Sequence, residues 1–198
     1  MERLRALPGG RRLVAVAGPP GAGKSTFAAD LRTALEKAGQ SAAVVPMDGF
    51  HLDNTLLRAK GLLPRKGAPE TFDGAGFVHL VSRVAAGERV VYPVFDRDRD
   101  IAIAGAGEVP PETSYVLFEG NYLLCDVAPW DRLRPLFSFR LLIDPGWEAI
   151  SRRLLSRWTD HGLSEADALR RRDENDMPNA RFVLEHSAAP DLTVVGEA

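Results

Sequence analysis

Residues 18–25 have the types and spacing of a loop that binds phosphate groups. The segment fits the pattern G-x-x-x-x-G-K-[ST] and consists of Gly18, Pro19, Pro20, Gly21, Ala22, Gly23, Lys24 and Ser25. Glycines let consecutive backbone N–H groups turn toward one anion, and a helix that begins here adds partial positive charge. The pattern therefore predicts a site for ATP or another nucleoside triphosphate, rather than a plain glycine-rich turn before a helix.

The polar side chains of this loop have distinct expected roles. Lys24 is expected to contact the β- and γ-phosphates, and Ser25 to bind Mg²⁺ through its hydroxyl. Thr26 follows and is expected to complete the nucleotide-binding segment by capping or buttressing the helix. The predicted cofactors are thus ATP and Mg²⁺.

Two acidic residues follow apolar runs that are typical of buried strands. Glu119 follows the run 115–118 and Asp48 follows the run 43–47, and a glycine comes after each acid. Ligands of open α/β proteins collect at the carboxyl edge of the sheet, so both acids are expected there. Glu119 is expected to bind the metal ion or a water molecule on that ion. Asp48, if the first two strands are neighbours, can accept or orient the proton of an acceptor hydroxyl. The alternative for both is a solvent-exposed cap at a strand end.

The segments around these motifs alternate between strands and helices. Apolar runs predict strands at 12–17, 42–47, 115–118, 139–143 and 192–195. Helical spacing occurs at 24–38, 77–86, 148–158, 164–172 and 181–186, more weakly at 53–61 and 129–136, while 67–76 is typical of a loop. Runs 89–95 and 101–109 indicate a hairpin outside the main sheet. The pattern predicts one α/β domain over 1–198, a P-loop NTPase with a doubly wound parallel sheet flanked by helices, a small β-hairpin and a helical lid.

Composition limits the classes of partner. The chain has 198 residues, a formal net charge of −2 and 26% charged residues, which gives no basic field for nucleic acid. No long uncharged apolar run predicts a membrane span, and no secretory signal is expected at the N-terminus. The single cysteine, Cys125, excludes an internal disulfide, fits a cytoplasmic protein and is expected to be buried. The predicted partner is a small-molecule acceptor, and a homodimer is left open.

Several segments resemble the phosphoribulokinase, uridine kinase and type I pantothenate kinase group of P-loop kinases. Segments 47–51 (MDGFH) and 61–73 (GLLPRKGAPETFD) are similar to the acceptor-side signature of pantothenate kinases. Segment 92–97 (YPVFDR) resembles the hairpin that holds the acceptor, and 118–124 (FEGNYLL) resembles the Walker B strand with its loop. The resemblance covers nearly the whole chain. It extends to bacterial proteins known as fructose transport system kinases, or nucleoside/nucleotide kinase family proteins.

This resemblance implies an ATP-dependent kinase with an alcohol as acceptor. It implies Asp48 as catalytic base, Glu119 near Mg²⁺ and the acceptor, and Arg153 and Arg157 in a lid over the phosphates. His51, Tyr92 and Arg97 are the expected acceptor contacts, although His51 also fits a packing or surface role and Arg97 a solvated hairpin tip. The hairpin does not reproduce the acceptor residues of uridine or pantothenate kinases. A fructose-like sugar is therefore the first expectation, and a nucleoside or a pantothenate-like acceptor is the alternative.

The remaining motifs have structural explanations. His79, His161 and His186 lack metal-ligand spacing. Trp147 and Trp158 are expected to pack the lid, and the arginines at 170–172 to form a solvated helical face. Segment 175–179 is expected to cap the following helix, with a role near the adenine as the alternative.

Two other classes of protein compete with the kinase hypothesis. A GTPase would need an N-K-x-D motif, which the chain lacks, and its one D-x-x-G match at 73–76 does not follow a buried strand. A non-catalytic nucleotide-binding regulator would need Lys24 and Ser25 but would tolerate loss of Asp48.

Overall fold

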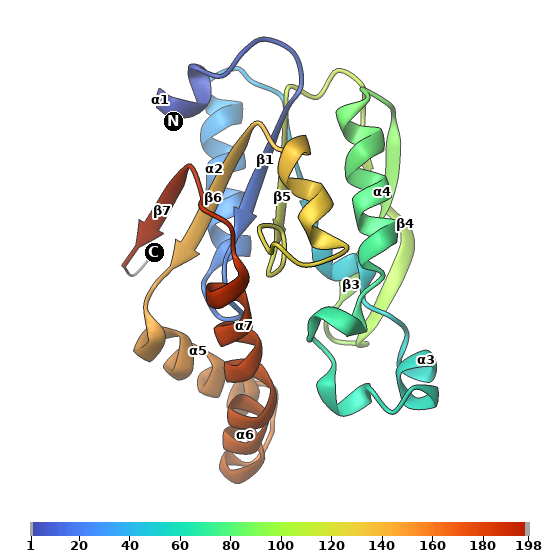
Figure 1. Ribbon diagram of the computed structural model, residues 1–198, viewed down its shortest axis with the longest axis vertical. Helices are drawn as coiled ribbons and strands as arrows, with labels where there is room; N and C mark the ends of the chain where they lie inside the picture. Colours follow the sequence, from blue (N-terminus) through green and yellow to red (C-terminus); the bar gives the residue numbers. More distant parts are fainter. Residues whose placement is uncertain (1, 197–198) are drawn as a thin grey trace.

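The computed structural model describes residues 2–196 and is built around a parallel sheet. The strand order is β2-β5-β1-β6-β7, and every neighbouring pair runs parallel. The strands point their carboxyl ends toward the same end of the molecule (Figure 1). Their bounds are β1 (Arg12–Ala17), β2 (Ala42–Pro46), β5 (Tyr115–Gly120), β6 (Phe139–Asp144) and β7 (Leu192–Val195).

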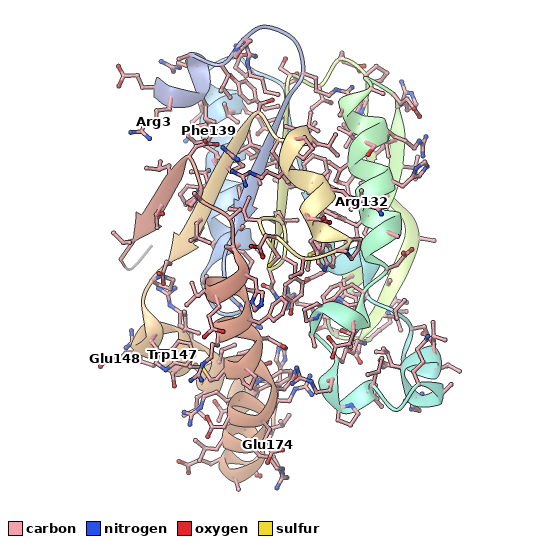
Figure 2. The ribbon with its side chains drawn as sticks, in the orientation of Figure 1. Arg3, Arg132, Phe139, Trp147, Glu148 and Glu174 are labelled. Atoms are coloured by element: carbon pink, nitrogen blue, oxygen red, sulfur yellow. The ribbon has the colours of Figure 1, made fainter. Side chains whose placement is uncertain are left out.

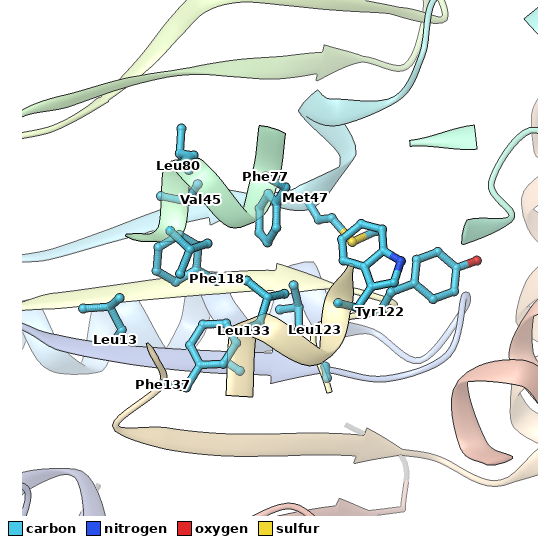
Figure 3. Close-up of a cluster of buried hydrophobic side chains, with 14 of the residues drawn as sticks. Leu13, Val45, Met47, Phe77, Leu80, Phe118, Tyr122, Leu123, Leu133 and Phe137 are labelled. Carbon is cyan, nitrogen blue, oxygen red and sulfur yellow. The ribbon is translucent and has the colours of Figure 1, made fainter. Parts of the chain in front are cut away.

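Helices cover both faces of this sheet, as the apolar runs of the strands require. Helices α1 (Glu2–Arg5) and α2 (Lys24–Lys37) lie on one face, against a buried cluster that includes Val14 and Leu117. Helix α4 (Gly74–Ala85) and the 3-10 helix η4 (Trp130–Leu136) lie on the other, where Phe77, Phe118 and Leu133 are buried (Figure 3). The doubly wound α/β fold is therefore confirmed.

A two-stranded hairpin lies outside the main sheet, as expected. Strands β3 (Val90–Asp96) and β4 (Ile101–Val109) pair antiparallel and pack on the 3-10 turn η1 (Met47–Phe50). The backbone of Gly49 approaches Pro93 so closely that a Cβ at Gly49 would lie 2.0 Å from the Pro93 carbonyl oxygen. Between η1 and α4 the chain forms α3 (Asn54–Ala59), η2 (Leu63–Arg65) and η3 (Pro69–Thr71). The loop expected at 67–76 therefore contains η3 and the first residues of α4.

The lid consists of α5 (Trp147–Asp160), α6 (Glu165–Arg171), η5 (Arg172–Asp176) and α7 (Met177–His186). Figure 1 shows these helices beyond the carboxyl ends of the strands. The expected cap at 175–179 is wrong, because η5 is a π-helical turn that joins α6 to α7 without a break, and Asp176 makes no side-chain cap at α7. Among residues 2–196, no helix is both long enough and apolar enough to cross a membrane.

Candidate active site

The loop between β1 and α2 has the backbone of a phosphate cradle. Gly18, Gly21 and Gly23 have backbone φ angles of 155°, 78° and 91°, which residues other than glycine rarely adopt. Gly23 is also the N-cap of α2 and has no side chain to cap this helix end, while Thr26 lies in the first turn of the helix and lines the cavity. The first N–H groups of α2 are thus left for an anion.

Lys24 is held across this loop and is buried, with 8% of its surface exposed. Its ammonium donates a 2.9 Å hydrogen bond to the carbonyl of Pro19. Burial lowers the pKa of Lys24 to about 8, although the nearby carboxylates of Glu119 and Asp48 oppose this shift. A cation with so little access to water is well placed to interact strongly with phosphate oxygens.

The two acids predicted at the sheet edge lie close to this lysine. Glu119 is 6% exposed and lines the same cavity as Ser25 and Lys24. Burial, and next the charge of Asp48, raise the pKa of Glu119. The register explains this convergence, because Glu119 pairs with Val16 of β1 on one side and with Pro46 of β2 on the other. Asp48 follows Pro46 in the turn η1.

The sequence analysis placed Asp48 beside the phosphate loop on the condition that the first two strands are neighbours, and this condition is not met. Strands β1 and β2 are not neighbours, because β5 lies between them. Asp48 nevertheless lines the same cavity as Lys24, since η1 leaves the sheet edge at the level where Glu119 stands. Asp48 therefore reaches the cavity without β1 and β2 being neighbours.

One cavity of about 390 Å³ joins the phosphate loop, the hairpin tip and the lid. It is lined by five cationic and four acidic side chains, together with polar and aromatic groups. From the sheet edge and loop come Pro20, Gly21, Gly23, Lys24, Ser25, Thr26, Asp48, Glu119 and Asn121; from the acceptor-side segments and hairpin His51, Lys66, Gly67, Phe72, Phe95, Arg97 and Asp100; and from the lid Arg157, Trp158, Arg171, Asp176 and Asn179.

His51 and Arg97 lie on the acceptor side of this cavity, but Tyr92 does not. The ring of His51 packs between Phe72 and Phe95 at centroid distances of 4.0 and 4.7 Å. Its Nδ1 lies 2.8 Å from the backbone oxygen of Asp48, which can only accept, so Nε2 of the neutral ring is left as an acceptor. Burial lowers the pKa of His51 and so favours this neutral ring. Tyr92 instead donates its hydroxyl to the Val44 carbonyl, 2.9 Å away, because its ring packs into the core.

The two expected lid arginines have different surroundings. Arg157 lines the cavity, and burial, then the charge of Arg97, lower the pKa of its guanidinium. Arg153 contacts the outside of the phosphate loop and donates a 3.3 Å hydrogen bond to the Ala22 carbonyl. Arg157 therefore faces the cavity, whereas Arg153 does not line it and is bonded to the backbone of the phosphate loop.

The tryptophans of the lid also differ. Trp158 lines the cavity, and its Nε1 donates a 2.5 Å hydrogen bond to the buried carboxylate of Asp176. Trp147, labelled in Figure 2, lies at the start of α5 with 42% of its surface exposed. The Arg181 guanidinium packs 5.7 Å from its ring centroid. Both tryptophans therefore pack against other residues of the lid, as expected, although only Trp158 also lines the cavity.

Comparisons with known proteins agree with this geometry. No family model matches the chain. The chain is 34% identical to "Uncharacterized protein YggC" of Escherichia coli K12, over 94% of this chain and 78% of that protein. It is 32% identical to "Putative uridine kinase C227.14" of Schizosaccharomyces pombe, over 93% of this chain and 83% of that protein. The chain belongs to the P-loop kinases of small molecules.

A solved structure supports the same assignment. The crystal structure named "putative fructose transport system kinase" from Silicibacter sp. TM1040 matches with a TM-score of 0.90 and 50% identity, over 96% of this chain and 91% of that one. The family resemblance found in the motifs is thus confirmed, and so is the class of the protein, a small-molecule kinase.

Several cavity residues of this kinase were not singled out from the sequence. They are Lys66, Asp100, Asn121 and Arg171. Asp176 and Asn179 also line the cavity, and they belong to segment 175–179, for which a role near the adenine was the alternative. Lys66 stands inside the signature 61–73, so the motif was a usable signal for it. The sequence predicts Arg171 to be part of a solvated helical face. In the fold it packs on Trp158 and donates a hydrogen bond to Pro64 of the acceptor-side loop, residues 62–67.

The other sequence candidates have structural surroundings. Cys125 is buried, and burial raises the pKa of its thiol to about 12. His79 and His161 are exposed, while His186 stacks on Phe182. Within the described chain there is no cluster of three or more histidine, cysteine, aspartate or glutamate residues that could hold a metal ion.

Proposed function

We propose that this kinase transfers the γ-phosphoryl group of ATP to an alcohol of a small metabolite, with a fructose-like sugar as the first acceptor to test. The observation that carries this proposal is the shared cavity of Lys24, at the phosphate loop, and Asp48, at the acceptor side. In-line transfer to a hydroxyl needs a cation that binds the phosphates and a carboxylate that faces the acceptor in the same cavity.

In this mechanism the protein mainly positions its substrates. Lys24 and the N-terminus of α2 bind the phosphates, and Arg157 neutralises charge that develops on the transferred group. Asp48 accepts the proton of the acceptor hydroxyl or orients that hydroxyl for attack. Nε2 of His51 can accept a hydrogen bond from a further hydroxyl of the acceptor.

The residues around Glu119 fit a magnesium ion. Glu119 is a buried carboxylate beside Asp48, and a divalent cation would offset the cost of burying these neighbouring negative charges. Ser25 and Glu119 would hold the ion, together with phosphate oxygens. When bound, the ion neutralises phosphate charge.

The acceptor can be tested directly. Purified protein with Mg-ATP is assayed for ADP release against D-fructose and other sugars, D-glycerate, pantothenate, uridine and cytidine. Asp48→Asn is measured in parallel, and we expect it to lower kcat by about 100-fold to 10,000-fold while ATP still binds. An acceptor-dependent rate that Asp48→Asn leaves unchanged would contradict the proposed role of Asp48. Tight ATP binding with no transfer to any acceptor would favour a nucleotide-binding regulator.

A further inference from the structure

The proposed base of this kinase is already paired with an arginine. Arg97 donates a 2.8 Å hydrogen bond from Nη2 to Oδ2 of Asp48. Arg97 stands at the tip of the β3–β4 hairpin, and its side chain is 53% exposed, against 24% for Asp48. The pair therefore lies at the solvent side of the cavity and occupies an oxygen that an incoming hydroxyl could use.

The other cations on the acceptor side are committed elsewhere. Lys66 has three N–H donors, and they are used by Asn54 Oδ1 at 2.7 Å and by the Asp100 carbonyl and carboxylate at 3.0 and 2.8 Å. Arg99, also at the hairpin tip, pairs with Asp96 at 2.8 Å. These contacts also neutralise Asp96 and Asp100, two of the acids beside Arg97.

Arg97 keeps donors for a ligand. A guanidinium has five N–H donors, and within residues 2–196 the one hydrogen bond from the Arg97 side chain is the bond to Asp48. Half-exposed ion pairs are weak, so an anion that binds the guanidinium more tightly can replace Asp48 as the partner of Arg97. The planar fork of an arginine binds carboxylate or phosphate through two parallel hydrogen bonds, which a single oxygen of Asp48 does not provide.

We infer that the acceptor is an alcohol that also carries a carboxylate or phosphate group, and that Arg97 binds this anion. This inference rests on the proposed function. Binding draws Arg97 away from Asp48 and frees the carboxylate for the acceptor hydroxyl. A neutral alcohol leaves Arg97 on Asp48. Arg97 thus selects anionic acceptors and couples their binding to exposure of the base.

Matched acceptor pairs test this inference. Each pair differs by the anion: glycerol with D-glycerate for a carboxylate, and D-fructose with D-fructose 6-phosphate for a phosphate. We expect kcat/KM for the anionic member of at least one pair to exceed that of the neutral member by about tenfold or more. The pair that shows the preference distinguishes carboxylate from phosphate.

Variants separate recognition from a general effect on the site. Arg97→Gln should lower kcat/KM for the anionic acceptor by about tenfold to a hundredfold and thereby abolish most of the preference for the anionic member of the pair. Arg97→Lys should restore part of the preference. Arg99→Gln, two residues away and paired with Asp96, is the matched control and should keep the wild-type preference.

The outcomes are distinct. Neutral acceptors that react as well as their anionic partners would overturn the inference and leave the proposed function standing. An equal loss for both members in Arg97→Gln would also overturn it, since Arg97 would then act only through Asp48. If no acceptor is phosphorylated although ATP binds, the proposed function fails and the inference fails with it.

Discussion

Lys24 is buried as a cation in the nucleotide-free protein, and this has a cost. Burial places its pKa at about 8, well below the 10.5 of an exposed lysine. The unfolded chain therefore binds more protons than the folded protein between pH 8 and pH 10.5. Below pH 8 the full penalty destabilises the fold, and it is relieved as pH rises through this window.

We predict that Lys24→Met stabilises the nucleotide-free kinase while it abolishes tight ATP binding. The expected gain at pH 7 is about 1–3 kcal/mol, because the substitution removes a buried charge from the folded state. Urea unfolding without nucleotide or Mg²⁺ measures this gain, which should shrink between pH 7 and pH 9.5. Lys37→Met changes an exposed lysine at the end of the same helix and should leave stability nearly unchanged. A destabilised Lys24→Met protein would contradict the burial argument.

At the level of single residues, the sequence predicted the phosphate loop well and the acceptor side poorly. The loop is one contiguous segment with a fixed spacing, so Lys24 and Ser25 could be identified without the fold. The acceptor side is built from three separate segments, and Lys66 and Asp100 meet only because the hairpin tip contacts the start of α3. Tyr92 was misplaced because alternation along a strand does not show which face turns toward the core.

Among the elements, η1 depends on a close contact that only glycine allows. We predict that Gly49→Ala destabilises the kinase by about 1–3 kcal/mol, since its Cβ would meet the Pro93 carbonyl and push the hairpin away from η1. Acceptor KM should rise as well, because Asp48 belongs to η1 and Arg97 to the hairpin. Thermal unfolding and initial rates measure both effects. Gly9→Ala, where no atom lies within 4 Å of a new Cβ, is the control and should behave like wild type.

The lid and the acceptor-side loop form one hydrogen-bonded unit. Arg171 donates to the carbonyls of Pro64 and Lys66, both at 2.9 Å, and Asn175 donates to Lys66 at 3.0 Å. Arg65 reaches in the opposite direction, to Asn175 and Asn179. The sequence could not show this link, because its partners are about a hundred residues apart and the run 170–172 has the charge pattern of a solvated face.

We predict that Arg171→Ala raises acceptor KM by about tenfold with a smaller change in kcat, since two hydrogen bonds that hold the acceptor-side loop are lost. Amide hydrogen exchange at 62–67 should become faster, which a purely catalytic role would not cause. The neighbouring Arg170 pairs with Asp167 on the outside of α6, so Arg170→Ala is the control. Unchanged exchange in Arg171→Ala would show that the link does not hold the loop.

For the molecule as a whole, the strand order gathers the site at one edge of the sheet. With β5 between β1 and β2, Glu119 stands between the phosphate loop and η1, and both acids lie near Lys24. The number and alternation of strands could be predicted from apolar runs, but their order could not, because nearly every position of these strands is apolar and fits several neighbours. The hairpin on one side and the lid on the other then border the cavity.

The Arg97–Asp48 pair at this cavity leads to a prediction about water as a competing acceptor. We expect phosphate release from ATP without an acceptor to be at least about 100-fold slower than transfer with one, because the ion pair of Arg97 with Oδ2 makes Asp48 a weaker base for water. Steady-state release of phosphate and of ADP, each with and without the best acceptor, measures this ratio. Asp48→Asn shows how much of the residual hydrolysis uses this base, and contaminating ATPases would not respond to it. Rapid hydrolysis that depends on Asp48 but not on an acceptor would contradict the account, since it would mean that water reaches an active base in the open site.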